Sequence, residues 1–201
     1  MIARRWLPAL ALLPFARAAS AAPPDILFRV VREGAQVGTH RVRFREDGGV
    51  LEAASEVRVQ VRLMGITVYR YSHDVVEAWR GERLVALSSR LDRNGTAKAC
   101  EARADASGLT LTGSSGQARL PAEAAPLTWW RAATLRPGVP LFDPREGIAV
   151  QPRLETAREG ANTRIRLIGG EGAEILYDRA GQWVGFATTG EDGSAVRYER
   201  A

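Results

Sequence analysis

The stretch LEAASEVRVQVRL, residues 51–63, decides the fold class of this 201-residue chain. Apolar or small side chains occupy its odd positions, and charged or polar side chains occupy most of its even positions. This alternation is typical of a long β-strand that buries one face and exposes the other. A strand with one buried face needs neighbouring strands, and the flanking sequence is expected to supply them.

The same alternation continues on both sides of this stretch. Residues 26–30 and 38–44 carry their apolar side chains at even positions, and arginines stand opposite them. Residues 69–79 carry theirs at odd positions. Short strands are expected further on, at residues 109–112, 117–120, 148–156, 164–168, 173–177, 182–188 and 195–199, separated by Gly-rich turn signals. The pattern predicts a sheet built almost entirely from antiparallel neighbours.

Three turns set the register of this sheet. Asn94-Gly95 is the strongest two-residue hairpin signal, and it pairs Leu91 with Lys98. The alternating apolar sets before and after Glu33-Gly34, within residues 26–30 and 38–44, have even numbers. For them to face each other, the loop must contain an odd number of residues, and we expect three. The turn at Met64-Gly65 also needs an odd number of residues if residues 57–61 are to face residues 69–73.

One segment departs from the strand pattern. Residues 126–136, PLTWWRAATLR, predict a short helix that Thr128 caps and Pro137-Gly138 ends. With no βαβ spacing and no long linker, we expect one domain over residues 22–201. The fold class is mainly β: a single strongly curved antiparallel sheet that forms an open barrel or roll, with one short helix.

Residues 1–21 are expected to be a signal peptide rather than part of the fold. Arg4 and Arg5 precede an apolar run at residues 6–16, and small residues at 19–21 offer a cleavage site. This run is shorter than the roughly 20 residues that span a bilayer, so we expect no transmembrane span. The arginine pair leaves both the Sec and the twin-arginine route open. The expected location is periplasmic or secreted.

Charge argues against nucleic acid as a partner. The chain has 28 basic and 23 acidic residues, a formal charge of +5. Loss of residues 1–21 removes Arg4, Arg5 and Arg17 and no acid, which leaves 25 basic against 23 acidic residues, or +2. Arginines and acids also alternate along the strand faces instead of forming a stripe of one sign.

Several motifs follow one another in an order that resembles the sequences of a known family. These motifs are Phe28-x3-Arg32-Glu33-Gly34-x2-Val37-Gly38, Glu77-x-Trp79-x4-Leu84-x2-Leu87, Thr128-Trp129-Trp130, Phe142-Asp143-x3-Gly147 and Tyr177-Asp178-x2-Gly181. They look like a secreted proteobacterial family known as domain of unknown function 6134, distantly similar to periplasmic lipoprotein-carrier half-barrels. Arg131 departs from the family's pattern, which has Asn there. The resemblance implies export and a β-rich fold, and it supplies no catalytic residues.

No motif of catalysis or cofactor binding is present in the sequence. His40 and His73 fall on the inward face without metal-motif spacing, so we expect hydrogen-bonded core histidines rather than a metal site. Cys100 has no CxxC partner and is expected to be a small buried apolar residue. Residues 113–116, GSSG, are not a nucleophile elbow, and Walker and dinucleotide-binding motifs are absent. We expect no cofactor and no enzymatic activity.

Aromatic side chains give the positive signal. Tyr69, Tyr71 and His73 alternate on one side of a strand, and a lid of aromatic residues would cover them. The candidate ligand-binding residues are His40, Tyr69, Tyr71, His73, Trp129, Trp130 and Phe142. Because small barrels fill their interiors, a packed core is the competing interpretation. Two functions remain open: a non-catalytic binding protein for a lipophilic ligand, and an envelope assembly module that binds another protein through a sheet edge.

Overall fold

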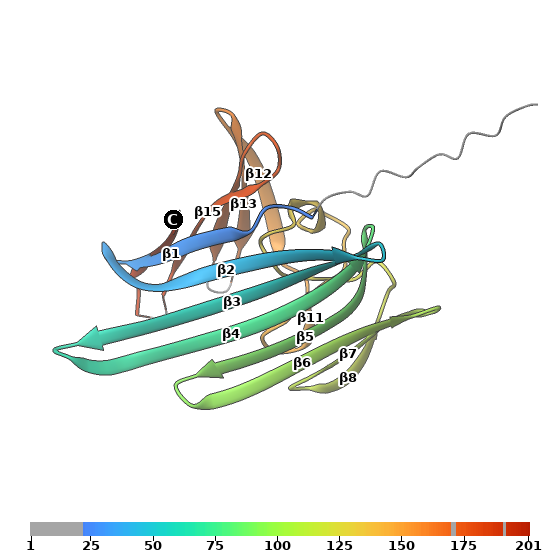
Figure 1. The fold of residues 1–201 in the computed structure, drawn as a ribbon, viewed down its shortest axis with the longest axis horizontal. Coiled ribbons are helices and arrows are strands. Elements are labelled where there is room, and N and C mark those ends of the chain that lie inside the picture. The colour runs from blue at the N-terminus through green and yellow to red at the C-terminus, as the bar shows by residue number, and fades with distance from the viewer. Residues whose placement is uncertain (1–21, 170–171, 191) are drawn as a thin grey trace, which may run out of the picture.

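The computed structural model describes residues 22–169, 172–190 and 192–201, and the expected signal peptide, residues 1–21, lies outside them. The described chain forms a 13-stranded antiparallel sheet and a small 3-stranded sheet (Figure 1). The first eight strands are β1 (Ile26–Arg32), β2 (Ala35–Asp47), β3 (Val50–Leu63), β4 (Ile66–Arg80), β5 (Arg83–Arg93), β6 (Thr96–Asp105), β7 (Gly108–Gly113) and β8 (Gly116–Leu120). The last five are β12 (Arg153–Glu159), β13 (Asn162–Ile168), β14 (Ala173–Tyr177), β15 (Trp183–Thr189) and β16 (Ala195–Arg200).

Two meanders join to make the large sheet. Strands β1–β8 follow one another in space as in sequence, and so do β12–β16. The two meanders meet where β16 pairs with β1, with Phe28 opposite Arg200. Strands β8 and β12 are the two edges of the sheet, and Figure 1 shows β12–β15 turned away from the broad layer of β1–β8. The expected mainly β, open and curved antiparallel architecture is confirmed.

The register agrees with the sequence pattern, although two turns are shorter than expected. Leu91 faces Lys98 across Asn94-Gly95, as predicted. The expectation of an odd number of loop residues at Glu33-Gly34 and at Met64-Gly65 is wrong. Each turn has two residues, and both have positive φ. A β-bulge between Val30 and Val31, and another between Val61 and Arg62, each absorb the extra residue. Two-residue turns of this kind match the strand twist, so a tight turn with a bulge replaces the longer loop.

The expected helix over residues 126–136 is wrong. The structure has a two-residue strand there, β9 (Ala125–Pro126), and a single 3-10 turn, η1 (Ala132–Thr134), without a side-chain cap. Backbone groups that would bond within a helix instead form hydrogen bonds with distant strands. The Leu127 amide donates to the Phe142 carbonyl of β10, and the Tyr177 hydroxyl of β14 donates to the Trp129 carbonyl at 2.7 Å. Tertiary hydrogen bonds therefore override the local helix signal.

The strand expected at residues 148–156 is two strands in two different sheets. β11 (Ile148–Val150) pairs with β10 (Leu141–Asp143) in the small sheet, whose order is β11-β10-β9, and β12 begins the large sheet after Pro152. A proline lacks the amide hydrogen that a strand ladder needs, which suits a position between two strands. The small sheet thus forms a compact insertion between the two meanders.

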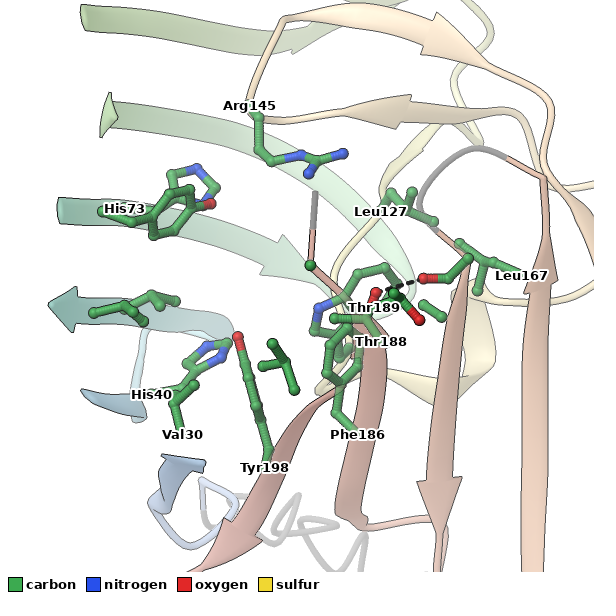
Figure 2. A pocket seen from close by; sticks show the side chains of 18 of the residues that line it. Val30, His40, His73, Leu127, Arg145, Leu167, Phe186, Thr188, Thr189 and Tyr198 are labelled. Carbon is green, nitrogen blue, oxygen red and sulfur yellow. Dashed lines mark hydrogen bonds between the residues drawn. The ribbon is translucent and has the colours of Figure 1, made fainter. Parts of the chain in front are cut away.

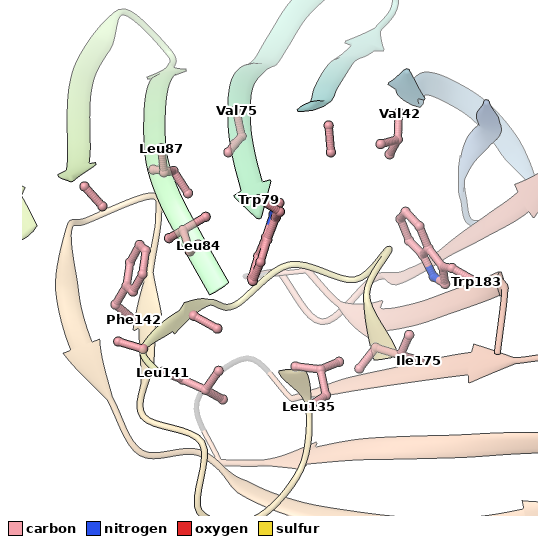
Figure 3. Packing of buried hydrophobic residues seen from close by; sticks show 14 of the residues in the cluster. Val42, Val75, Trp79, Leu84, Leu87, Leu135, Leu141, Phe142, Ile175 and Trp183 are labelled. Atoms are coloured by element: carbon pink, nitrogen blue, oxygen red, sulfur yellow. The ribbon is translucent and has the colours of Figure 1, made fainter. Parts of the chain in front are cut away.

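This insertion closes one end of the roll. Leu141 and Phe142 of β10 belong to the same buried cluster as Trp79 and Leu84 (Figure 3). A close backbone contact joins the insertion to β7, because a Cβ on Gly113 would lie only 2.4 Å from the Gly147 Cα. The hydrophobic core therefore fills the end of the roll at which β4 finishes, and the opposite end is not covered by the small sheet.

Candidate ligand cavity

The concave face of the large sheet lines a partly open cavity of about 860 Å³ (Figure 2). Its aliphatic lining includes Val30, Val42, Val57, Val59, Val61, Val68, Val75, Leu127, Val150 and Leu167. Its aromatic lining is Tyr69, Tyr71, Trp129, Trp130, Trp183, Phe186 and Tyr198. A smaller polar group includes His40, Ser55, His73, Thr128, Asp143 and Arg145. The walls are thus mainly apolar, with a minority of polar and charged residues that also includes Arg32, Arg93 and Asp192.

Strands β3 and β4 form one wall through simple alternation. Val57 stands opposite His73, Val59 opposite Tyr71 and Val61 opposite Tyr69. All these residues have odd numbers, so their side chains lie on the same face of the sheet. The predicted facing of the two sets is therefore confirmed.

The opposite wall comes from the C-terminal strands, which the sequence analysis did not single out. Trp183 and Phe186 of β15 and Tyr198 of β16 line the cavity. The ring centroids of Trp183 and Tyr198 lie 5.0 and 5.5 Å from the ring centroid of His40, and both rings meet the imidazole edge to face. Figure 2 shows His40 beside Tyr198. The sequence predicted a strand at residues 182–188, but Trp183 and Phe186 differ in parity and reach one face through a β-bulge in the pairing of β14 with β15. The pairing of β16 with β1 that brings this wall to His40 is not local in sequence.

Both histidines are buried and held by serine. The His40 Nε2 lies 2.7 Å from the Ser55 Oγ, and the His73 Nε2 lies 2.8 Å from the Ser89 Oγ. Burial, followed by the charge of His73, lowers the pKa of His40 to about 3. Burial, followed by the charge of Arg145, lowers the pKa of His73 to about 4. The two imidazoles are therefore neutral near pH 7, as expected for hydrogen-bonded buried histidines.

One buried polar atom at the cavity, the His40 Nδ1, has no hydrogen-bond partner among the described residues. Leaving a buried polar atom unpaired costs roughly 1–3 kcal/mol. The Thr128 hydroxyl, also at the cavity, instead acts on the Glu77 carboxyl as a hydrogen-bond donor that lowers its pKa. The His40 Nδ1 therefore leaves an unused hydrogen-bonding position at the cavity wall.

An ion pair at the end of β10 and an arginine of β5 bring charged groups to the cavity wall. The Arg145 Nη2 pairs with the Asp143 Oδ2 at 2.9 Å, and both residues line the cavity. The Arg93 guanidinium lies 5.9 Å from the centre of the Tyr71 ring. Burial is the main reason that the pKa of the Tyr71 hydroxyl rises to about 12, so this group stays protonated and can donate a hydrogen bond.

The structure brings six of the seven expected site residues to the cavity: His40, Tyr69, Tyr71, His73, Trp129 and Trp130. The expected lid position of Phe142 is wrong, because this side chain is fully buried in the core cluster. The two adjacent tryptophans, Trp129 and Trp130, are both half-buried. They lie on an extended loop and not on a helix, so the rotation of about 100° per helical residue does not separate them.

Glu77 is a buried acid that the sequence analysis passed over. It is fully buried on β4, and its carboxylate accepts hydrogen bonds from the indole nitrogens of Trp79, at 2.8 Å, and Trp130, at 3.0 Å. Burial raises the pKa of Glu77 to about 7, and the two indole donors oppose that rise. Arg131 lies with its guanidinium carbon 4.5 Å from the centre of the Trp79 ring. The odd number of Glu77 already placed it on the inward face.

Groups that bind metals do not gather in the part of the chain that the structure describes. No cluster there of three or more His, Cys, Asp and Glu side chains could hold a metal ion. Cys100 is a free, buried thiol, as expected, and burial raises its pKa to about 11. Among the described residues, no helix is long and apolar enough to cross a membrane.

Comparisons with known proteins give a family and one similar solved structure. A crystal structure of a duf1089 family protein from Pseudomonas aeruginosa is 14% identical, covers 87% of this chain and 95% of its own, and superposes with a TM-score of 0.43. No curated protein matches the chain. The family model described as "Domain of unknown function (DUF6134)" matches residues 28–201, as the motif order suggested. The chain therefore belongs to the DUF6134 family.

Proposed function

We propose that the protein is a non-catalytic binding protein that holds a lipophilic ligand in the cavity on the concave sheet face. The observation that carries this proposal is the cavity itself. Its volume of about 860 Å³ falls within the roughly 300–1,000 Å³ of small-molecule sites, and most of its lining is aliphatic or aromatic. A close-packed protein interior leaves few voids larger than a water molecule.

The polar groups of the cavity support a ligand with a small neutral head. The histidines are poor general bases near pH 7, because their pKa values lie near 3 and 4. A hydroxyl or carbonyl group on the ligand would suit the Tyr71 hydroxyl and the His40 Nδ1, and the latter has no partner among the described residues. We therefore propose a largely apolar molecule with one or two hydrogen-bonding groups.

Export is part of the same proposal. The signal-like pattern of residues 1–21 supports a periplasmic or secreted protein that begins near Ala22. Mass spectrometry of the N-terminus, on protein purified from a host that exports it, measures this directly. An intact Met1 on the soluble cytoplasmic protein would refute it.

The binding proposal is tested by filling the cavity from one wall. Val59→Phe adds volume among the lining residues, whereas Val76→Phe makes the same change on the outer face of β4, where Val76 is 41% exposed. We expect purified wild type and Val76→Phe to bind a fluorescent fatty acid such as parinaric acid, and Val59→Phe to bind it at least about tenfold more weakly. Circular dichroism and thermal melts check that both variants are folded.

Two results would refute the proposal. One is a wild-type protein that binds no lipophilic probe and yields no small molecule by native mass spectrometry after periplasmic expression. The other is equal probe binding by wild type and a folded Val59→Phe variant, because the probe would then sit elsewhere.

A second candidate function uses the sheet edges. Strands β8 and β12 each have one neighbour in the large sheet, and most of their residues are exposed. Exposed edges can pair with a strand of another protein. A stoichiometric protein partner in a pull-down from an envelope fraction, lost on a proline substitution at Ala118 of β8, would favour this assembly module over the carrier.

A further inference from the structure

The hairpin of β3 and β4 projects beyond both of its neighbours. The pairing of β2 with β3 starts at Gly38 and Val59, and the pairing of β5 with β4 ends at Arg93 and Tyr71. Residues 60–63 and 66–69 therefore pair only with each other, whereas the backbone of Arg70 is still held by Asn94 of the β5–β6 turn. Figure 1 shows this hairpin extending furthest at its end of the sheet. At about 3.4 Å per residue, the projecting part is roughly 12 Å long.

The end of this hairpin is apolar and exposed. Leu63 is 64% exposed, Met64 96%, Ile66 69% and Val68 54%. We call these four residues the apolar tip. They make up four of the six large hydrophobic residues that are exposed in the described chain. Scattered exposed apolar residues are ordinary on a soluble protein, but their concentration at one projecting end is not.

Turn geometry does not explain the residue at the apex. Met64 has φ of 49°, a left-handed conformation that is unusual for a long apolar side chain. The equivalent position of the β5–β6 turn carries Asn94, with φ of 52°. Asn-Gly is the favoured pair for such a turn, so folding alone would select Asn at position 64. Met64 thus costs some local stability and leaves its side chain in solvent.

Positive charge flanks the apolar tip. Arg62 and Arg70 are exposed, and neither side chain forms an ion pair or hydrogen bond with another described residue. Arg62 lies two residues from Met64, which places it about 7 Å behind the apex. Interfacial elements bury their apolar side chains about 5–10 Å deep at the boundary of headgroups and acyl chains, so the Arg62 guanidinium would sit at headgroup depth. Arg70 pairs with Gln60, roughly 14 Å behind the apex, and would lie just outside the headgroups, within the reach of their surface charge.

The apolar tip is continuous with the cavity. Val68 both belongs to the tip and lines the cavity, and Val61 and Tyr69 of the same hairpin also line it. Tyr69 has the amphipathic character that suits the border between lipid and water. An apolar track therefore runs along one hairpin from the exposed end to the Val59 and Tyr71 pair inside.

We propose that the apolar tip inserts into a lipid surface that carries anionic headgroups and that it connects the cavity with that surface. The second half of this statement rests on the proposed lipophilic-ligand function, whereas the first half does not. A protein partner fits less well, because four side chains at the end of a hairpin fall far short of the roughly 20–30 residues that each partner supplies to a stable interface. The two unpaired arginines complement anionic phospholipid headgroups.

Vesicle flotation tests the insertion. The protein without residues 1–21 is mixed with vesicles of phosphatidylcholine containing phosphatidylglycerol, and with vesicles of phosphatidylcholine alone. We expect wild type to float with the first and less with the second, and the difference to shrink in high salt. The double variant Met64→Asn, Ile66→Thr should bind at least about tenfold more weakly, since it removes two of the four inserted side chains. Asn-Gly suits the turn, so this variant should fold at least as well as wild type.

Two further variants make the result specific. Val76→Thr removes an exposed apolar side chain from the outer face of the same strand, and it should float like wild type. Arg62→Gln with Arg70→Gln should lose the preference for phosphatidylglycerol and keep the weaker binding to phosphatidylcholine. Failure of wild type to float, or equal flotation of wild type and the folded tip variant, overturns the inference.

Parinaric acid binding in solution, measured on the same samples, separates this inference from the proposed function. A wild type that binds parinaric acid and does not float refutes the insertion alone. A wild type that floats through its tip and binds no lipophilic probe refutes the carrier function and leaves the insertion supported.

Discussion

Replacing Glu77 with Gln should make the protein more sensitive to acid. His40 and His73 have folded pKa values of about 3 and about 4, below the ordinary 6.5. Their contribution to stability is present above pH 6.5 and is lost as the pH falls toward the folded values. Glu77 has a folded pKa of about 7, above the ordinary 4.5. Its contribution has the opposite sign: it is present below pH 4.5 and is lost as the pH rises through 7.

The expected size follows from the protons that each state binds. Between pH 4.5 and 6.5 the unfolded chain protonates both histidines, while the folded protein holds one proton, on Glu77. Wild type should therefore lose about 1.4 kcal/mol of unfolding free energy per pH unit of acidification, or about 3 kcal/mol over this window. Without the Glu77 carboxyl the difference becomes two protons, and the loss should double to about 6 kcal/mol.

Urea unfolding at several pH values between 4.5 and 6.5 measures these slopes. The slope is the informative quantity, because Gln can accept a hydrogen bond from only one of the two indoles and should lower stability by about 1–2 kcal/mol at every pH. Glu52→Gln, on the exposed face of β3, is the matched control for the loss of a carboxyl. Parallel pH slopes for wild type and Glu77→Gln would show that Glu77 is ionised in the fold across this window and would refute the reasoning.

Three other substitutions or treatments have definite outcomes. Gly38→Ala should lower the unfolding free energy, measured with urea, by more than about 3 kcal/mol or prevent folding. The reason is that the added Cβ would lie 2.0 Å from the Arg58 carbonyl oxygen of the paired strand. A variant as stable as wild type would contradict that close contact. Trp183→Ala should lower the unfolding free energy by about 3–5 kcal/mol, since the indole is fully buried and its ring centroid lies 4.5 Å from that of Phe28. A loss below about 1 kcal/mol would contradict this packing. Cys100 should resist a thiol reagent at pH 8 in the folded protein and react at once in urea, as its burial and raised pKa require.

Alternation predicted the walls of the cavity because it is a local property. Each residue of a strand points opposite to its neighbour, so the numbers of Tyr69, Tyr71 and His73 were enough to place them on one face. The Asn94-Gly95 turn then fixed a register that the structure reproduces. Where two bulges changed the turn lengths, the same pairs still met, because burial of one face constrains register more strongly than loop length does.

Interactions between distant segments could not be predicted in this way. The tryptophans at 129 and 130 lie in a loop, because strands far away in the sequence hold its backbone groups. Phe142 joins the core because β9 and β10 form a separate small sheet, for which the sequence offered only a proline-bounded segment. The wall that contains Tyr198 depends on β16 reaching β1, at the other end of the chain.

Strand β4 shows how a filled core and a cavity coexist in one sheet. Its inward residues from Tyr69 to Val75 line the cavity, whereas Trp79 lies in the core beneath the insertion. Glu77 stands between these two regions, and its carboxylate binds one indole from each: Trp79 of the core and Trp130 of the cavity wall. Since Trp130 contacts both the Glu77 carboxylate and the cavity, any change in the charge of Glu77 acts on a residue of the cavity wall as well as on Trp79 of the core. Glu77 therefore lies at the boundary between the packed core and the cavity, where its two indole donors offset part of the cost of burying an acid.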